Sequence, residues 1–122
     1  MRLQQEFRHI LIVRTDRIGD VILTLPMAQA LRRLYPHARI AMLIRRYTAP
    51  LVEDHPAVDD YLLYDDGEQP TPFFRMVREL RSGGFDLVLH THPRPRVALM
   101  TFLAGIPVRV GTGYRWYSAL FN

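Results

Sequence analysis

The stretch Ile10-Leu-Ile-Val-Arg-Thr-Asp-Arg-Ile-Gly-Asp20 decides the fold of this chain. Its apolar run, Ile10 to Val13, is long enough for a strand and too short for a helix. Because no polar residue alternates within the run, both faces of the strand should be buried, as at the centre of a parallel sheet. Thr15 to Gly19 predicts a turn, and Asp20 stands where a helix could begin and where its carboxylate could cap free N–H groups. A strand, a turn and a helix N-terminus are typical of a ligand site in an open α/β sheet.

The helix after this turn contains Pro26, which leaves two positions for its start. If Asp20 caps the helix, Pro26 removes an interior hydrogen bond and should kink it. Alternatively, the regular helix starts near Thr24, and Pro26 falls in its tolerant first turn. Pro36 ends the helix in either case. The apolar residues fall into two rows, so the helix is expected to be buried on more than one side; the second row is Leu23, Met27, Ala30 and Leu34.

The rest of the chain alternates between strand and helix patterns. We expect strands at 38–44, 61–64, 87–89 and 108–110, and helices at 47–53, from Thr71-Pro72 to Gly83, and at 97–103. In the second of these helices Thr71 is the expected cap and Pro72 the first helical residue, and Phe73, Phe74 and Met76 are expected in the core. This order predicts an α/β fold, a doubly wound parallel sheet with right-handed crossovers.

Length and composition predict one ordinary globular domain. The chain has 122 residues, 48% of them hydrophobic and 23% charged, with no cysteine and therefore no disulfide or thiolate chemistry. No apolar run approaches the roughly 20 residues of a membrane span, and Met1 to His9 carries no signal-peptide pattern, so the expected location is cytoplasmic. The net charge is +4, and arginine supplies every basic residue. This composition suits an anionic partner, although a basic surface without a partner is equally compatible.

The sequence His90-Thr-His92-Pro-Arg94-Pro-Arg96 follows the strand predicted at 87–89. In a parallel sheet it lies at the same edge as Asp20. Two histidines separated by one residue also occur in metal-dependent hydrolases, which would make His90 and His92 metal ligands. Such a site needs further ligands at later strand ends, and none is visible, so we expect no metal site.

Several segments in order resemble glycosyltransferase family 9, the ADP-heptose:lipopolysaccharide heptosyltransferases and their relatives. The similar segments are Arg14 to Pro26, Ala30-Leu-Arg-Arg-Leu-Tyr-Pro36, Ala38-Arg-Ile40, Leu51-Val-Glu-Asp-His-Pro56, Phe85-Asp-Leu-Val-Leu89 and Ala104-Gly-Ile-Pro-Val-Arg-Val-Gly111. The resemblance implies a Rossmann-like domain, residues 1–122, that forms the N-terminal, acceptor-binding half of a two-domain (GT-B type) glycosyltransferase. The C-terminal domain, which binds the nucleotide sugar, would then be absent from this chain.

The resemblance also implies an activity. Family members transfer a heptose or related sugar from an ADP-sugar to an anionic, membrane-anchored lipopolysaccharide core, without a metal or other cofactor. The aspartate of their Gly-Asp pair is the proposed base, and Asp20 occupies that position. A helix N-terminus stabilises an ionised carboxylate and so weakens it as a base, which leaves a plain helix cap as the alternative role of Asp20.

The remaining site residues follow from the same resemblance. Acceptor contacts are expected from Arg17, Gly19, His92, Arg94, Arg96 and Arg115. Arg115 belongs to Gly111-Thr-Gly-Tyr-Arg115-Trp116, a loop that could clamp a sugar acid or phosphate. Basic and aromatic residues do not interleave there as in a nucleic-acid surface, so nucleic acid is not an expected partner. The expected location is the cytoplasmic face of the inner membrane of a Gram-negative-type bacterium, to which the protein would bind peripherally. The competing interpretation is a non-catalytic glycan- or anion-binding module.

Overall fold

The computed structural model describes residues 7–15, 18–91 and 95–111 of the chain. The strands and helices in chain order are β1 (His9–Val13), α1 (Ile18–Leu34), β2 (Arg39–Ile44), the 3-10 helix η1 (Arg46–Leu51), β3 (Asp60–Leu63), α2 (Phe73–Ser82), β4 (Leu87–His90), α3 (Pro95–Leu103) and β5 (Val108–Gly111). Within the described ranges, none of the helices combines the length and the hydropathy that crossing a membrane requires.

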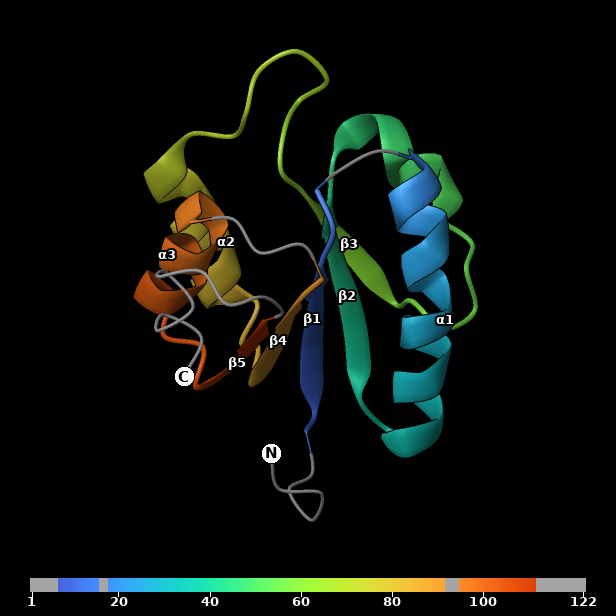
Figure 1. The fold of residues 1–122 in the computed structure, drawn as a ribbon. Helices are drawn as coiled ribbons and strands as arrows, with labels where there is room; N and C mark the ends of the chain where they lie inside the picture. The colour runs from blue at the N-terminus through green and yellow to red at the C-terminus, as the bar shows by residue number, and fades with distance from the viewer. Residues whose placement is uncertain (1–6, 16–17, 92–94, 112–122) are drawn as a thin grey trace.

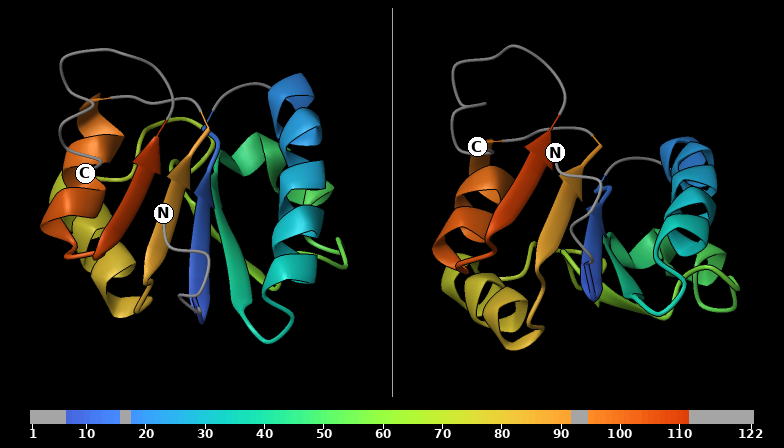
Figure 2. Two further views of the ribbon diagram at one scale, coloured as in Figure 1. Left: turned by 60° about the horizontal axis from the view of Figure 1, so that its bottom comes forward. Right: turned by 90° about the horizontal axis from the view of Figure 1, so that it is seen from below.

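The strands form one parallel sheet in the order β3-β2-β1-β4-β5. Helices α1 and η1 cover one face of this sheet, and α2 and α3 cover the other (Figure 1). Figure 2 shows the sheet between these two layers from two further directions. The predicted doubly wound α/β fold is therefore confirmed.

Strand β1 is the centre of the core. Its residues Ile10 to Val13 are at most 2% exposed. Ile10 and Ile12 pack on the side of α1, while Leu11 and Val13 pack on the side of α2 and α3. An apolar run without polar alternation thus predicted the two-sided burial correctly.

Helix α1 begins at Ile18 and continues through Pro26, so a start near Thr24 is wrong. Pro26 lies on the exposed side of the helix, where water can hydrogen bond to the carbonyl that loses its backbone donor. The Thr24 hydroxyl donates to the carbonyl oxygen of Asp20 at 2.8 Å, one turn back. Asp20 therefore lies inside the first turn, at the third helical residue, and not at the cap.

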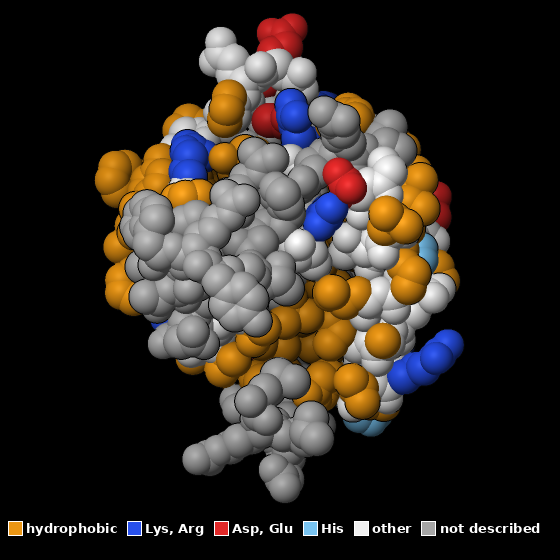
Figure 3. All heavy atoms as spheres, viewed as in Figure 1, with side chains coloured by type: hydrophobic (Ala, Val, Ile, Leu, Met, Phe, Trp, Pro, Cys, Tyr) orange, Lys and Arg blue, Asp and Glu red, His pale blue; other side chains and the backbone are white. Residues whose placement is uncertain are grey.

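The expectation that α1 is buried on more than one side is wrong. Val21 and Ala28 are fully buried against the sheet, but Leu23 is 77% exposed and Leu34 67% exposed. Figure 3 shows hydrophobic side chains at intervals along the outer surface of this helix. The sheet offers α1 only one packing surface, and helical periodicity alone cannot tell which of two apolar rows faces it.

Helix α2 begins one residue later than predicted. Pro72 occupies the cap position with φ −54° and ψ 142°, and Thr71 does not cap the helix. Instead the Thr71 backbone N–H donates to the Tyr64 carbonyl at 2.8 Å, and the Thr71 hydroxyl donates to the Leu63 carbonyl at 3.1 Å. The helix ends at Gly83 as predicted, and Gly84 takes the left-handed conformation with φ 67°.

The expected core positions of α2 are only partly confirmed. Met76 and Leu80 are fully buried, and Phe73 is partly buried against the same cluster. Phe74, which was expected in the core, is 73% exposed. Adjacent helical residues point in different directions, so Phe73 and Phe74 cannot both face the sheet.

A matched pair of leucine substitutions tests this packing. We expect Leu80→Ala to lower the free energy of unfolding by about 3 kcal/mol, because it removes a fully buried side chain and leaves a cavity under α2. Leu23→Ala makes the same chemical change at a residue that is 77% exposed and should change it by less than about 0.5 kcal/mol. Urea denaturation of both variants measures the difference. Equal losses would contradict the burial of α2 described above.

Candidate functional site

The carboxyl ends of β1 and β4 define the candidate site. Both strands are central, and the chain turns from β1 toward β2 on one side and from β4 toward β5 on the other. At such a reversal the loops after the two strands diverge and leave a crevice, where ligands bind in open α/β sheets. The residues that follow these strands are Arg14 and Thr91.

Arg14 connects the two loops. Its Nη2 forms an ion pair with Oδ1 of Asp20 at 3.0 Å, and its Nη1 donates to the carbonyl oxygen of Thr91 at 3.1 Å. The side chain is only 15% exposed, so these contacts compensate a largely buried guanidinium. Thr91 is held in turn by its hydroxyl, which donates to the Val13 carbonyl at 2.7 Å. A guanidinium at the end of a buried strand needs partners or solvent, and Arg14 has partners on both loops.

Asp20 lies in the first turn of α1 beside this arginine. Its side chain is 36% exposed, so the carboxylate is held by Arg14 and still reaches solvent. The first-turn position also places it near the positive end of the helix dipole. Gly19, the residue before it, is exposed and lies within α1, not in the preceding turn. A Cβ at Gly19 would meet nothing within 4 Å, so internal packing does not require glycine there.

Arg96 lies at the same edge of the sheet, on the side of α2 and α3. Its Nη1 donates to the Tyr64 hydroxyl at 2.9 Å, and its guanidinium lies 5.6 Å from the Tyr64 ring centroid and 5.5 Å from that of Phe73. These are hydrogen-bond and cation–π contacts from the ends of β3 and α2. In the described part of the chain no contact joins Arg96 to Asp20. The other expected acceptor residues, Arg17, His92, Arg94 and Arg115, lie outside the described residues.

The basic pair Arg45-Arg46 serves a structural role. Arg45 Nε contacts Oδ2 of Asp65 at 2.9 Å, and the Arg46 backbone N–H donates to Oδ1 at 2.8 Å. Burial of Asp65 opposes ionisation, but these hydrogen bonds outweigh it and lower the pKa of the carboxyl. Arg45 also lies over the Tyr47 ring, 5.4 Å from its centroid. The pair therefore fastens the end of β2 to the loop after β3.

His90 is part of the core. It is 2% exposed at the end of β4, with Nε2 3.3 Å from the Thr101 hydroxyl of α3. That hydroxyl also donates to the Ala98 carbonyl at 3.0 Å, so Thr101 joins His90 to the backbone of α3. Burial, helped by the charge of Arg109, lowers the pKa of His90 to about 4. Among the described residues no three His, Asp or Glu side chains are placed to hold a metal ion.

Sequence comparison finds related transferases. No protein-family model matches the chain. It is 26% identical to a putative glycosyltransferase of Haemophilus influenzae over 113 residues, 93% of this chain and 33% of that protein. It is also 26% identical to lipopolysaccharide heptosyltransferase 3 of Escherichia coli, over 84% of this chain and 32% of that protein. The chain thus spans about a third of the length of these relatives.

Solved structures of glycosyltransferases share the fold of this chain. A glycosyltransferase family 9 protein of Veillonella parvula superposes with a TM-score of 0.81 over 96% of this chain and 35% of that one, at 22% identity. This chain resembles glycosyltransferase family 9. ADP-heptose lipopolysaccharide heptosyltransferase II of Escherichia coli gives a TM-score of 0.72 at 25% identity, over 84% of this chain and 30% of that one. Family 9 structures therefore share the fold described above over most of its length.

Three residues at this edge of the sheet were not expected from the sequence: Thr91, Tyr64 and Phe73, the partners of Arg14 and Arg96. Thr91 and Tyr64 each come directly after a strand, which is the position that could have marked them. Phe73 was assigned to the core alone, although its ring also lies under a guanidinium.

The buried histidine gives this domain a defined pH response. His90 has a pKa of about 4 when folded and about 6.5 when unfolded, so between pH 6.5 and 4 the unfolded chain takes up the proton before the folded chain does. The stability is fully present above pH 6.5 and falls by about 3 kcal/mol as the pH approaches 4. We expect His90→Gln to flatten this part of the curve of unfolding free energy against pH, because glutamine does not titrate.

The exposed His37 provides the control for this measurement. His37→Gln should leave the pH dependence of the wild-type chain in place, while carboxyl groups titrate alike in all three proteins. A His90→Gln variant whose stability falls as steeply as that of the wild type between pH 6.5 and 4 would contradict the assignment.

Proposed function

We propose that the protein containing this chain is a glycosyltransferase that moves a heptose or related sugar from an ADP-sugar to a lipopolysaccharide core acceptor. This chain would supply the acceptor side and the catalytic base. The observation that carries the proposal is the carboxylate of Asp20, held by Arg14 at the carboxyl ends of β1 and β4, where the strand order reverses. Relatives named glycosyltransferase and heptosyltransferase, each matching this chain over most of its length, support the reaction class.

The chemistry assigned to Asp20 is proton removal from the acceptor hydroxyl. As the hydroxyl oxygen forms a bond to the anomeric carbon of the sugar, the carboxylate takes its proton. The bond between that carbon and the diphosphate oxygen breaks, and its electron pair leaves with ADP. Arg14 holds Oδ1, and the partial exposure of Asp20 leaves the carboxylate open to the acceptor.

The basic side chains of this chain suit an anionic acceptor. We assign acceptor contacts to Arg96, which already stands at the sheet edge, and to Arg17, Gly19, His92, Arg94 and Arg115. The ADP-sugar would be held mainly by the part of the longer relatives that this chain does not span. A membrane-anchored acceptor and a net charge of +4 fit a cytoplasmic protein that works at the surface of the inner membrane of a Gram-negative-type bacterium.

Replacing the proposed base tests the mechanism. In the complete enzyme, we expect Asp20→Asn to lower kcat roughly 10²–10⁴-fold, because the amide cannot accept the proton, and to leave the acceptor KM nearly unchanged. Asp54→Asn, at an exposed turn residue, is the matched control and should keep wild-type turnover. Steady-state kinetics with an ADP-heptose donor measure both. Undiminished turnover in Asp20→Asn would remove Asp20 as the base.

The same assay distinguishes the proposed transferase activity from the alternative of a non-catalytic glycan- or anion-binding module. If the complete protein binds the acceptor without any transfer from a range of nucleotide sugars, the non-catalytic interpretation would replace this one.

Replacing Arg96 tests the acceptor side. We expect Arg96→Gln to raise the acceptor KM about tenfold or more with a smaller change in kcat, because glutamine keeps a hydrogen-bond donor for Tyr64 but loses the charge. Thermal unfolding of the same variant reports the loss of packing on Tyr64 and Phe73. An unchanged KM together with a lowered Tm would show that Arg96 is only structural.

A further inference from the structure

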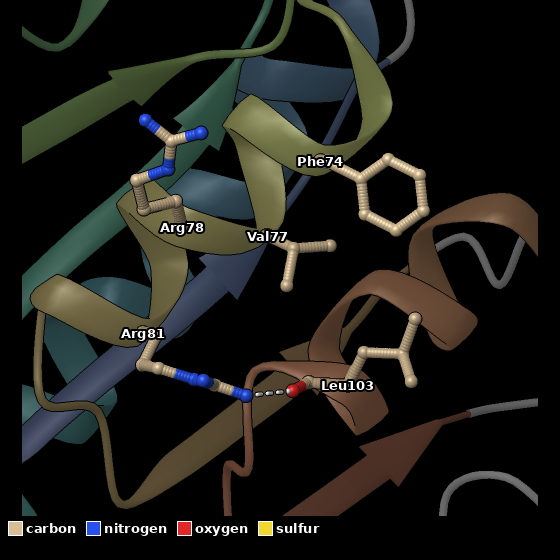
Figure 4. Close-up of a pocket in the computed structure, with 5 residues that line it drawn as sticks. All are labelled: Phe74, Val77, Arg78, Arg81 and Leu103. Carbon is tan, nitrogen blue, oxygen red and sulfur yellow. Dashed lines mark hydrogen bonds between the residues drawn. The ribbon is translucent and has the colours of Figure 1, made fainter.

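Helices α2 and α3 share a shallow pocket on the surface of the molecule. It measures about 400 Å³ and is lined by Phe74, Val77, Arg78, Arg81 and Leu103. Figure 4 shows Phe74 and Leu103 projecting from the two helices beside Val77, with Arg81 reaching across to the backbone of Leu103. That contact is a hydrogen bond of 2.8 Å from Arg81 Nη2 to the Leu103 carbonyl, which joins the two helices. Three apolar side chains and two arginines therefore line the pocket.

The apolar side chains around the pocket face solvent. Phe74 is 73% exposed and Leu103 38%, and on α3 the same exposure continues to Leu99 at 39% and Phe102 at 47%. Leu99, Phe102 and Leu103 are three and four residues apart, so they lie on one side of the helix. An exposed aromatic and three exposed apolar residues on neighbouring helices are more than single scattered surface hydrophobics.

The charge around these residues is almost entirely positive. Helix α2 carries Arg75, Arg78 and Arg81 against a single acidic residue, Glu79. Arg75 is paired with Glu79 at 3.2 Å, and Arg81 donates to Leu103. Arg78 is exposed and makes no hydrogen bond or ion pair within the part of the chain that the structure describes. Its charge is therefore available to an anion outside the molecule.

We propose that this surface, formed by Phe74, Arg78, Leu99, Phe102 and Leu103, docks on an anionic lipid bilayer. Phe74 enters the boundary between headgroups and acyl chains, and Arg78 meets lipid phosphates. Aromatic and basic side chains on one surface are the combination that binds at such an interface. A protein partner would need acidic groups matched to one arginine position, whereas a bilayer presents phosphate all over its surface.

The proposed docking surface lies next to the edge of the sheet that carries Arg96. The Phe74 ring lies 5.1 Å from that of Phe73, and Phe73 in turn lies under Arg96 at the carboxyl edge of the sheet. Docking through Phe74 therefore brings the edge that carries Arg96 toward the lipid. This step rests on the proposed function, in which the acceptor is membrane-anchored; the docking measurement itself needs neither donor nor acceptor.

Vesicle binding tests the proposal. The protein is sedimented with vesicles of equal parts phosphatidylcholine and phosphatidylglycerol, and with pure phosphatidylcholine as the neutral comparison. We expect binding to the anionic vesicles only, and a loss of roughly tenfold or more in Phe74→Ser and again in Arg78→Glu. The matched controls are Leu23→Ser and Arg33→Glu, exposed residues of α1 on the opposite face of the sheet, which should bind like the wild type (Figure 1).

A second measurement reports contact directly. Phe74→Cys and Leu23→Cys each introduce one cysteine into this chain, which has none, and an environment-sensitive fluorophore is attached to it. The label at position 74 should shift to the blue on anionic vesicles, and the label at position 23 should not. The proposal is overturned if the wild-type protein does not bind anionic vesicles, or if the α1 variants lose as much binding as the α2 variants. It is also overturned if the fluorescence of the label at position 74 does not shift.

The remaining alternative is that this surface binds a second copy of the protein. Sedimentation equilibrium without lipid that shows a dimer in the wild type and a monomer in Phe74→Ser would assign the surface to a second copy and overturn the lipid assignment. The test is independent of transfer: a protein with full activity on a soluble acceptor analogue that fails to bind vesicles refutes only the docking surface.

Discussion

The burial of β1 on both faces is the constraint on which the rest of the structure depends. A strand with apolar side chains on both sides needs a layer of helices on each, and it needs a hydrogen-bonded strand on each edge. β2 and β4 provide the edges, α1 provides one layer, and α2 and α3 provide the other. The chain leaves β1 toward one edge of the sheet and later returns to form β4 on its other side, so the strand order reverses beside β1. Arg14 is the first polar side chain beyond the buried run, and its position at this reversal follows from the same constraint.

Much of the fold could be predicted because each strand is short, apolar and bounded by glycine, proline or a polar turn. The predictions are wrong where the conformation or burial of a residue depends on another element that packs or hydrogen bonds against it. Leu23 and Leu34 belong to an apolar row at helical spacing, but the sheet is already covered by the row that contains Val21 and Ala28. Thr71 has the character of a helix cap, but its hydroxyl and its backbone N–H donate instead to the carbonyls of Leu63 and Tyr64 at the end of β3. Local patterns carry no information on such competition.

The candidate site was predictable only in part. Asp20 could be selected from its position after a strand and turn, and from the family resemblance. Its partner Arg14 could be expected to have a contact, but the identity of that contact depends on the register of the sheet. Thr91 is 77 residues from Arg14 along the chain, and β1 and β4 become neighbours only after the chain has crossed the sheet. His90 was read as a possible ligand because its burial depends on α3, which covers it from a later part of the sequence.

The double contact of Arg14 has a mechanical consequence. A guanidinium is planar and rigid, so its two outer nitrogens keep a fixed separation and angle. One of them holds the carboxylate of Asp20, and the other holds the backbone that follows β4. The two contacts therefore hold the Asp20 carboxylate and the Thr91 peptide on one rigid group at the end of β1. The first turn of α1 and the start of the loop after β4 share this one support.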